Sequence, residues 1–153
     1  MIKLLFVCHC PSANTKTLRD SAAHGVRQMK LENLELRIQT PAATDAGDVE
    51  WCNGIVLGTT ENFGYMAGMT KDFFERIYYP CLNSTPGLPV ALYIRAGEDG
   101  TGTKTSIERI MTGLRWKLVA DPLILRGNWD ANFQHQVSEL AMTVAAGLDA
   151  GIY

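Results

Sequence analysis

The sequence predicts a doubly wound α/β fold, in which a five-stranded parallel sheet carries helices on both faces. Short apolar runs alternate along the chain with longer segments whose apolar residues recur every three or four positions, and most connections are short. Because parallel strands need crossover connections, which helices provide, this alternation indicates strands and helices in turn. With 153 residues and no repeat, low-complexity stretch or linker, the chain is expected to form a single domain over residues 1–153.

Five short segments are the expected strands. The first run, residues 2–8, is interrupted only by Lys3, which is typical of a strand buried on both faces. The other expected strands cover residues 34–39, 54–58, 88–94 and 123–125. Five strands suit this chain length better than the six of a dinucleotide-binding domain.

Four segments have the apolar spacing of helices. In the first, Leu18, Ala22, Val26 and Met29 lie three or four residues apart and so share one helix face. The next three cover residues 70–79, 104–117 and 133–148, and Pro80 is expected to end the first of these. A helix therefore follows the first, third, fourth and fifth strands.

Composition and charge exclude several classes of function. Sixteen acidic and fourteen basic residues give a net charge of −2 without a basic stripe, so the chain is not expected to bind nucleic acid. The apolar start of the chain is too short for a signal peptide, and no segment is long enough to cross a membrane. The four cysteines lack the spacing of a zinc site, so no metal is expected. A reduced, cytoplasmic protein is the simplest interpretation.

The candidate site is formed by three loops. In a doubly wound fold, ligands bind beyond the carboxyl ends of the strands, near the point where the strand order reverses. The loops at residues 9–17, 59–69 and 95–103 follow three of the expected strands. These loops are therefore expected to meet at one edge of the sheet.

The first loop has the character of an anion site. Free backbone N–H groups at the start of a helix favour an anion, and Ser12, Asn14, Thr15 and Thr17 add side-chain donors. The loop contains neither the dinucleotide glycine motif nor a P-loop. The alternative is an ordinary helix cap formed by these polar residues.

The second and third loops are suited to a flat ligand. Phe63 and Tyr65 lie beside two glycines in the second loop, so they could flank a planar ring. The alternative is that both aromatic rings fold back onto the core. The third loop has three glycines in nine residues, more than the start of a helix needs. Together the loops indicate a mononucleotide with a planar head group.

Two motifs carry a resemblance to a known family. Residues 11–15, Pro-Ser-Ala-Asn-Thr, resemble the phosphate loop of flavodoxins, which typically ends Thr-Gly-Asn-Thr. Residues 58–66, Gly-Thr-Thr-Glu-Asn-Phe-Gly-Tyr-Met, resemble the Gly-Thr-Pro-x-x-Phe-Gly-x-Met stretch of flavodoxin-like quinone reductases. In element order the whole chain is similar to this flavodoxin-like family. Ala13 stands where the first motif usually has glycine, so a positive φ there would be strained, and Thr60 replaces the proline.

The resemblance implies non-covalent FMN as the cofactor. It implies that the phosphate is held by Cys10, Ser12, Ala13, Asn14, Thr15 and Thr17. It also implies that the isoalloxazine ring and the ribityl chain are enclosed by Thr59, Thr60, Glu61, Asn62, Phe63, Gly64, Tyr65, Ala96, Gly97, Glu98, Asp99 and Gly100. Because a flavin carries the chemistry itself, no catalytic side chain is needed.

Two functions follow from this resemblance. The first is an FMN-dependent oxidoreductase that passes electrons from NAD(P)H to a quinone or another small acceptor. The second is a flavodoxin-type electron carrier, which serves a redox partner protein and has no turnover of its own. Carriers of this kind are usually strongly acidic, because that charge speeds association with basic partners, so a net charge of −2 favours the enzyme.

A phosphatase is a remote third alternative. Residues 4–8 resemble the first strand and nucleophilic cysteine of low-molecular-weight tyrosine phosphatases, and Asp121-Pro122 resembles their general acid. Those enzymes need an arginine six residues after the cysteine to hold the phosphoryl group. Asn14 follows Cys8 at that distance and Lys16 follows Cys10, which disfavours this function.

The expected helix at residues 70–79 is a candidate contact surface. It carries Tyr78 and Tyr79 in addition to the apolar residues that one core-facing side requires. The chain has no room for the extra segment through which quinone reductases of the family build a tetramer. If the chain forms oligomers, a homodimer through this helix is therefore expected.

Overall fold

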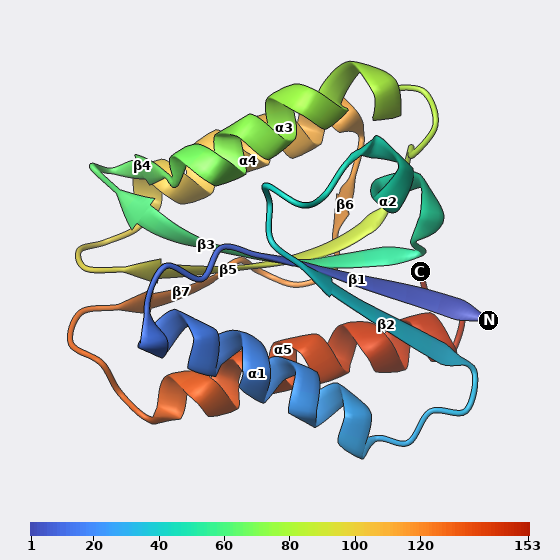
Figure 1. The fold of residues 1–153 in the computed structure, drawn as a ribbon, viewed down its shortest axis with the longest axis horizontal. Coiled ribbons are helices and arrows are strands. Elements are labelled where there is room, and N and C mark those ends of the chain that lie inside the picture. The colour runs from blue at the N-terminus through green and yellow to red at the C-terminus, as the bar shows by residue number, and fades with distance from the viewer.

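A twisted sheet runs through the middle of the computed structural model, which describes residues 1–153 (Figure 1). Its strands are β1 (Ile2–Cys8), β2 (Leu34–Gln39), β3 (Gly54–Asn62), β4 (Tyr65–Met66), β5 (Pro89–Ala96), β6 (Lys117–Leu118) and β7 (Leu123–Arg126). The helices are α1 (Ala13–Gln28), α2 (Ala46–Trp51), α3 (Gly68–Cys81), α4 (Thr101–Leu114) and α5 (Asn132–Asp149). Strands and helices largely alternate as the sequence predicts, but α2, β4 and β6 were not predicted, and α4 ends at Leu114 where the predicted helix continued to residue 117. Helix α2 was missed because its one buried residue, Val49, gives no helical apolar spacing.

The strand order confirms the doubly wound α/β fold. The sheet runs β2-β1-β3-β5-β6, β7 pairs with β5, and all of these pairs are parallel. The chain adds β2 on one side of β1 and β3 on the other, so the direction of winding reverses at β1. The short strands β6 and β7 pair with the beginning and the end of β5, respectively.

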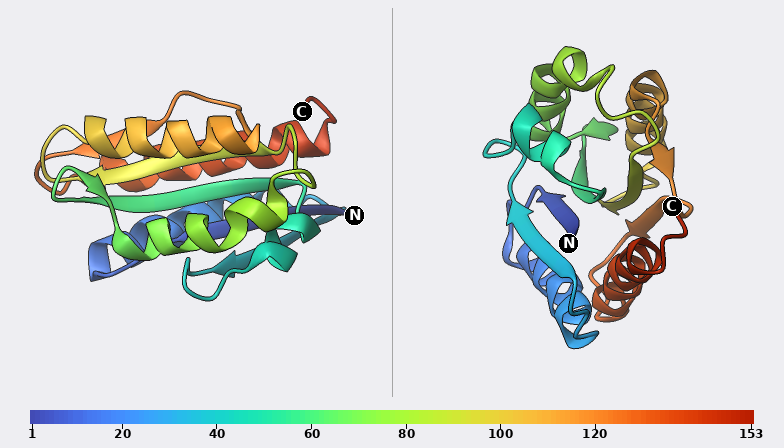
Figure 2. Two further views of the ribbon diagram at one scale, coloured as in Figure 1. Left: turned by 90° about the horizontal axis from the view of Figure 1, so that it is seen from above. Right: turned by 90° about the vertical axis from the view of Figure 1, so that its right-hand side faces the viewer.

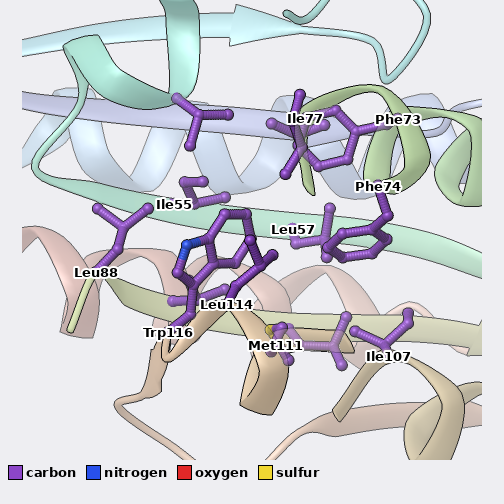
Figure 3. Packing of buried hydrophobic residues seen from close by; sticks show 14 of the residues in the cluster. Ile55, Leu57, Phe73, Phe74, Ile77, Leu88, Ile107, Met111, Leu114 and Trp116 are labelled. Atoms are coloured by element: carbon purple, nitrogen blue, oxygen red, sulfur yellow. The ribbon is translucent and has the colours of Figure 1, made fainter. Parts of the chain in front are cut away.

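Two layers of helices enclose the sheet. Helices α2, α3 and α4 cover one face, and α1 and α5 cover the other, as the end-on view of Figure 2 shows. The core is correspondingly divided into one apolar cluster on each face. In the cluster beneath α3 and α4, Phe74 packs against Phe73 and Trp116 with ring centroids 5.3 and 6.1 Å apart (Figure 3). Burial on both faces accounts for the apolar runs of the central strands.

Two differences from the expected elements bear on the site, and a third lies at the far end of α3. Strand β3 continues four residues beyond Gly58 to Asn62 and then turns back through β4, which pairs with it in antiparallel fashion. Helices α1 and α4 each begin earlier than their apolar spacing indicates, at Ala13 and Thr101. Helix α3 also continues through Pro80, which lies in its last turn and so removes only one helical hydrogen bond.

None of the five helices is both long and apolar enough to cross a lipid bilayer. This finding agrees with the hydropathy of the sequence, in which every apolar run is short.

Candidate ligand-binding site

The three loops singled out in the sequence meet at the edge formed by the carboxyl ends of β1, β3 and β5, on the left in Figure 1. The parallel register pairs Cys8 with Gly58 and Thr60 with Arg95, so the three strands end close to one another. The His9 amide donates to the Gly58 carbonyl at 2.9 Å and ties the first loop to β3. None of the molecule's five cavities is lined by the second or third loop, and from the first loop only Thr17 lines one, a polar hollow between α1 and α5.

The start of α1 presents backbone donors at this edge. Ser12 caps the helix, and the N–H groups of Ala13 and Asn14 lie in its first turn, where no helical acceptor exists for them. No acidic residue occupies this turn, and Lys16 is exposed one position beyond it. Helix dipole, free donors and charge therefore all favour an anion here.

The hydroxyl groups of this segment have other partners. The Ser12 and Thr15 side chains form a reciprocal capping box, in which Thr15 N donates to Ser12 Oγ at 3.2 Å and Ser12 N to Thr15 Oγ1 at 3.0 Å. Thr17 Oγ1 donates to the Ala13 carbonyl at 3.0 Å, and the half-buried Cys10 thiol lies 3.5 Å from the Thr15 carbonyl oxygen. These side chains hold the helix start in shape, and their contacts with a phosphate stay a prediction.

Ala13 is not strained. It is the first residue of α1, and the positive φ expected if it took the place of the usual glycine does not occur. The helix begins early enough that a residue with a Cβ is accommodated at this position.

The second loop is a tight hairpin with an exposed aromatic tip. Phe63 and Gly64 connect β3 to β4 with φ values of 54° and 71°, the pattern of a type I′ turn. Phe63 is fully exposed, with a relative accessibility of 108%, and Tyr65 is 41% exposed. The rings therefore do not fold back onto the core, which was the alternative interpretation. A left-handed backbone conformation is energetically costly for phenylalanine, and this ring gains no packing that would offset the cost. The conformation therefore suggests a role outside the core.

The residues before the turn are mostly occupied by internal contacts. Thr59 is buried, and its hydroxyl lies 2.8 Å from that of Thr70 in α3. Thr60 donates to the Asn62 side-chain oxygen at 2.9 Å. These hydrogen bonds fix the end of β3. The bond to Thr70 directs the Thr59 side chain toward α3 and away from the edge formed by the strand ends.

The third loop is held against the second by Glu61. Its carboxylate accepts hydrogen bonds from the Gly100 amide at 2.7 Å and from the Glu98 amide at 3.3 Å. Gly100 has a φ of 70°, and a Cβ on it would press against Ile124, so this position requires glycine. Beside Gly97, by contrast, the space is open. The structure thus brings Glu61, Glu98 and Gly100 together, but through a carboxylate that is already bonded.

Two arginines that the sequence analysis did not single out, one in β5 and one in β7, hold the third loop and the end of β7 together. Arg95 donates to the carbonyls of Leu125 and Gly127 at 3.0 and 2.7 Å, and Arg126 Nε donates to the Asp99 carbonyl at 2.7 Å. The position of Arg95 at the end of a strand beside a glycine-rich loop was the only signal available in the sequence. Its partners become evident only once β7 lies beside β5.

Cys8 does not have the properties of a nucleophile. Its side chain is fully buried, and burial raises the pKa of the thiol to about 12, although hydrogen bonding to Tyr93 offsets part of this effect. A nucleophilic cysteine instead needs access and a lowered pKa. Asn14, which would replace the phosphatase arginine, lies in the first turn of α1. The structure therefore argues against the phosphatase alternative.

His9 lies between the end of β1 and the start of α1, at the rim of the edge. Partial burial lowers the pKa of its imidazole below the ordinary value, so the ring is neutral at pH 7. The side chain therefore brings no charge to the anion-favouring start of α1.

A parallel sheet wound in this order, with its loops gathered beyond β1, β3 and β5, defines the chain as a protein of the flavodoxin-like fold. The solved structure of a flavodoxin from the domain Archaea superposes on it with a TM-score of 0.79 at 15% identity, covering 96% of this chain and 99% of the other. The resemblance stated from the sequence is thereby confirmed at the level of the fold.

Sequence and structure comparisons point the same way. A flavodoxin of Aquifex aeolicus (strain VF5) is 26% identical over 114 residues, which are 74% of this chain and 60% of that protein. The rubredoxin oxygen:oxidoreductase of Desulfovibrio gigas contains a similar region, with a TM-score of 0.74 and 14% identity over 98% of this chain but 36% of its own. No model of a protein family matches the sequence.

Proposed function

We propose that this protein binds FMN at the edge of the sheet formed by the strand ends and acts as a redox flavoprotein. One observation carries the proposal: on a flavodoxin-like fold, unpaired N–H groups at the start of α1 and the exposed aromatic tip of the β3–β4 hairpin lie at the same edge of the sheet. The first suits a phosphate, and the second suits a flat ring.

The residues present fit an FMN phosphate at the start of α1. The backbone N–H groups of Ala13 and Asn14 would donate to it, and the exposed Asn14 side chain and Lys16 are near enough along the helix to contribute. The hydroxyls of Ser12 and Thr15 would reach it only by leaving their capping bonds. Backbone donors therefore carry most of the binding.

The second and third loops fit the remainder of the cofactor. Phe63 and Tyr65 offer exposed aromatic faces, and the open space beside Gly97 permits close approach of the backbone. Both loops are linked through Glu61, so the two walls are held at a defined separation. Bound FMN would supply one- or two-electron redox chemistry, and the chain would supply binding, orientation and electrostatics.

Within this class we favour an oxidoreductase that passes electrons from NAD(P)H to a quinone or another small acceptor. The net charge of −2 supports it, because electron carriers usually have a strongly acidic surface that speeds docking to basic partners, and this chain is only weakly acidic. A region of the same fold within the rubredoxin oxygen:oxidoreductase gives further support. The alternative is an electron carrier, which the likeness to flavodoxins favours. Four free thiols support a reducing, cytoplasmic location for either function.

Replacing Ala13 with proline tests the phosphate assignment. Proline is tolerated at the first position of a helix, and Ser12 before it already has the extended backbone that proline requires, with φ −136° and ψ 166°. The substitution removes one proposed phosphate donor, so FMN affinity should fall by about tenfold while the fold is retained. The measurement is a fluorescence titration of the apoprotein with FMN, together with a thermal melt.

Ala46→Pro is the matched control. Ala46 is the first residue of α2, after a capping Asp45 whose backbone is also extended, with φ −119° and ψ −179°. It should leave FMN affinity unchanged. If Ala13→Pro binds FMN as tightly as the unmodified protein, the phosphate does not lie at α1. Reduction of the bound flavin by NADH or NADPH would support the oxidoreductase, and failure of both nucleotides to reduce it would support the carrier.

A further inference from the structure

The start of α4 lacks a cap of its own. Its capping position is Gly100, which has no side chain, and no side chain from the helix accepts from that residue's amide. The Asp99 side chain accepts a hydrogen bond from the Thr101 amide at 3.0 Å but none from the Gly100 amide. The Gly100 amide instead donates to Glu61, which comes from β3, 39 residues earlier in the chain, at 2.7 Å. A residue of the second loop therefore caps the helix that follows the third.

The hairpin also rests directly on the first turn of α4. A Cβ on Gly102 would collide with the carbonyl oxygen of Gly64, so the hairpin turn and the helix are in close contact there. The Glu61 carboxylate thus lies at the positive end of the α4 dipole, which is a favourable arrangement, and the Gly64 carbonyl lies beside the first turn. The contact requires glycine at position 102 and joins the two loops at a second point.

We propose that Glu61 is a positioning residue that locks the β5–α4 loop to the β3–β4 hairpin before any cofactor arrives. Its oxygens are occupied by the Glu98 and Gly100 amides, so it acts on the ligand through these loops. The effect on FMN rests on the proposed function, whereas the effect on the loop does not. This differs from direct contact between Glu61 and the cofactor, which the family resemblance implies.

The lock matters because the outer part of the third loop has only one other hydrogen bond to a side chain from outside the loop, from Arg126 Nε to the Asp99 carbonyl at 2.7 Å. Gly97, Glu98 and Asp99 are all exposed, and Glu98 and Asp99 bring two further negative charges close to that of Glu61. The hydrogen bonds from the two amides oppose this repulsion, because hydrogen bonds to a charged acceptor are stronger than neutral ones. Without them, the loop would sample other conformations, and part of the binding free energy would be spent on ordering it.

Glu61→Gln tests the proposal, because glutamine keeps the length of the side chain but replaces one acceptor oxygen by a donor. We expect the Gly100 amide to exchange with solvent about tenfold faster in the apoprotein, as measured by NMR. Core amides such as that of Leu92 should keep their exchange rates, which separates loss of the lock from general loss of stability. FMN affinity should fall by about tenfold as well.

Glu108→Gln is the matched control. It makes the same change of charge on α4, away from the loop, and should alter neither the exchange rate nor the FMN affinity. Unchanged exchange at Gly100 in Glu61→Gln would overturn the lock. Faster exchange with unchanged FMN affinity would overturn the positioning role and leave the proposed function intact. If the unmodified protein binds no FMN, the proposed function fails, and the exchange rates still decide whether the lock exists.

Discussion

At the scale of single residues, burial perturbs the chemistry of all four thiols. Burial raises the pKa of Cys8 and Cys52 to about 12 and that of Cys81 to about 11. The pKa of Cys10 is also raised, mainly by desolvation, although this thiol is only half-buried. All four thiols are therefore protonated and weakly nucleophilic at neutral pH.

This predicts how the native protein responds to a thiol reagent. At pH 8, DTNB should modify at most one thiol, that of Cys10, whereas all four should react after unfolding in guanidinium chloride. Raising the pH toward 10 should speed the reaction of Cys10 before that of the others, because only its side chain is accessible. Rapid modification of two or more thiols in the native state would contradict the burial described here.

Phe63 predicts a trade-off between stability and binding. Its left-handed backbone is costly for phenylalanine but acceptable for asparagine, and its ring has no packing to lose. Phe63→Asn should therefore stabilise the fold by about 1 kcal/mol, which raises Tm by about 2–4 °C at this size. The same variant should weaken FMN binding, because an exposed aromatic face is removed. A lower Tm would show that Phe63 contributes to the fold itself.

At the scale of elements, the close contact between β3 and β5 depends on Gly58. A Cβ at this position would collide with the ring of Tyr93, which is buried on the neighbouring strand. Gly58→Ala should therefore lower the free energy of unfolding by about 1–3 kcal/mol, as overpacking does. Gly68→Ala is the control, because nothing lies within contact distance there and alanine favours the helix. Equal stability of the two variants in urea denaturation would contradict the packing.

The elements that the sequence predicts well are those with a regular pattern of apolar residues. Strands β1 and β2 have the predicted bounds, since β1 is a continuous apolar run apart from Lys3 and β2 alternates apolar with polar residues. The extension of β3 was missed because Thr59–Asn62 are polar, and their strand conformation depends on pairing with β5 and β4. The starts of α1 and α4 were missed because helix caps are set by polar contacts, which apolar spacing does not report.

The candidate site was predictable in location but not in detail. The alternation of elements places the three loops at one edge, because parallel strands end on the same side. The capping role of Glu61 and the contacts of Arg95 were not predictable, since both side chains bond to loops more than 30 residues away. The exposure of Phe63 likewise depends on the turn geometry and not on its residue type.

At the scale of the whole molecule, the homodimer expected from the sequence stays a proposal with a defined surface. Tyr79 is 80% exposed beside a groove of about 250 Å³ between α3 and α4, lined by Phe74, Tyr78 and Ile110. Lys71 and Glu75 on the same rim give the face both signs of charge, so an antiparallel copy would be complementary to it.

Light scattering coupled to size exclusion measures this directly. A dimer is expected for the unmodified protein and a monomer for Tyr79→Lys, because a charge would be buried in the contact. Thr143→Lys, on the exposed side of α5, should leave the dimer intact. A monomeric unmodified protein at concentrations of tens of micromolar would contradict the proposal.

The central claim is that the protein binds FMN, with the phosphate at the start of α1 and the isoalloxazine ring between the second and third loops. Titration of the apoprotein with FMN and with riboflavin, followed by flavin fluorescence, tests it most directly, since the two ligands differ only in the phosphate. We predict one FMN per chain and at least about tenfold weaker binding of riboflavin. Absence of FMN binding, or equal affinity for the two flavins, would contradict the account.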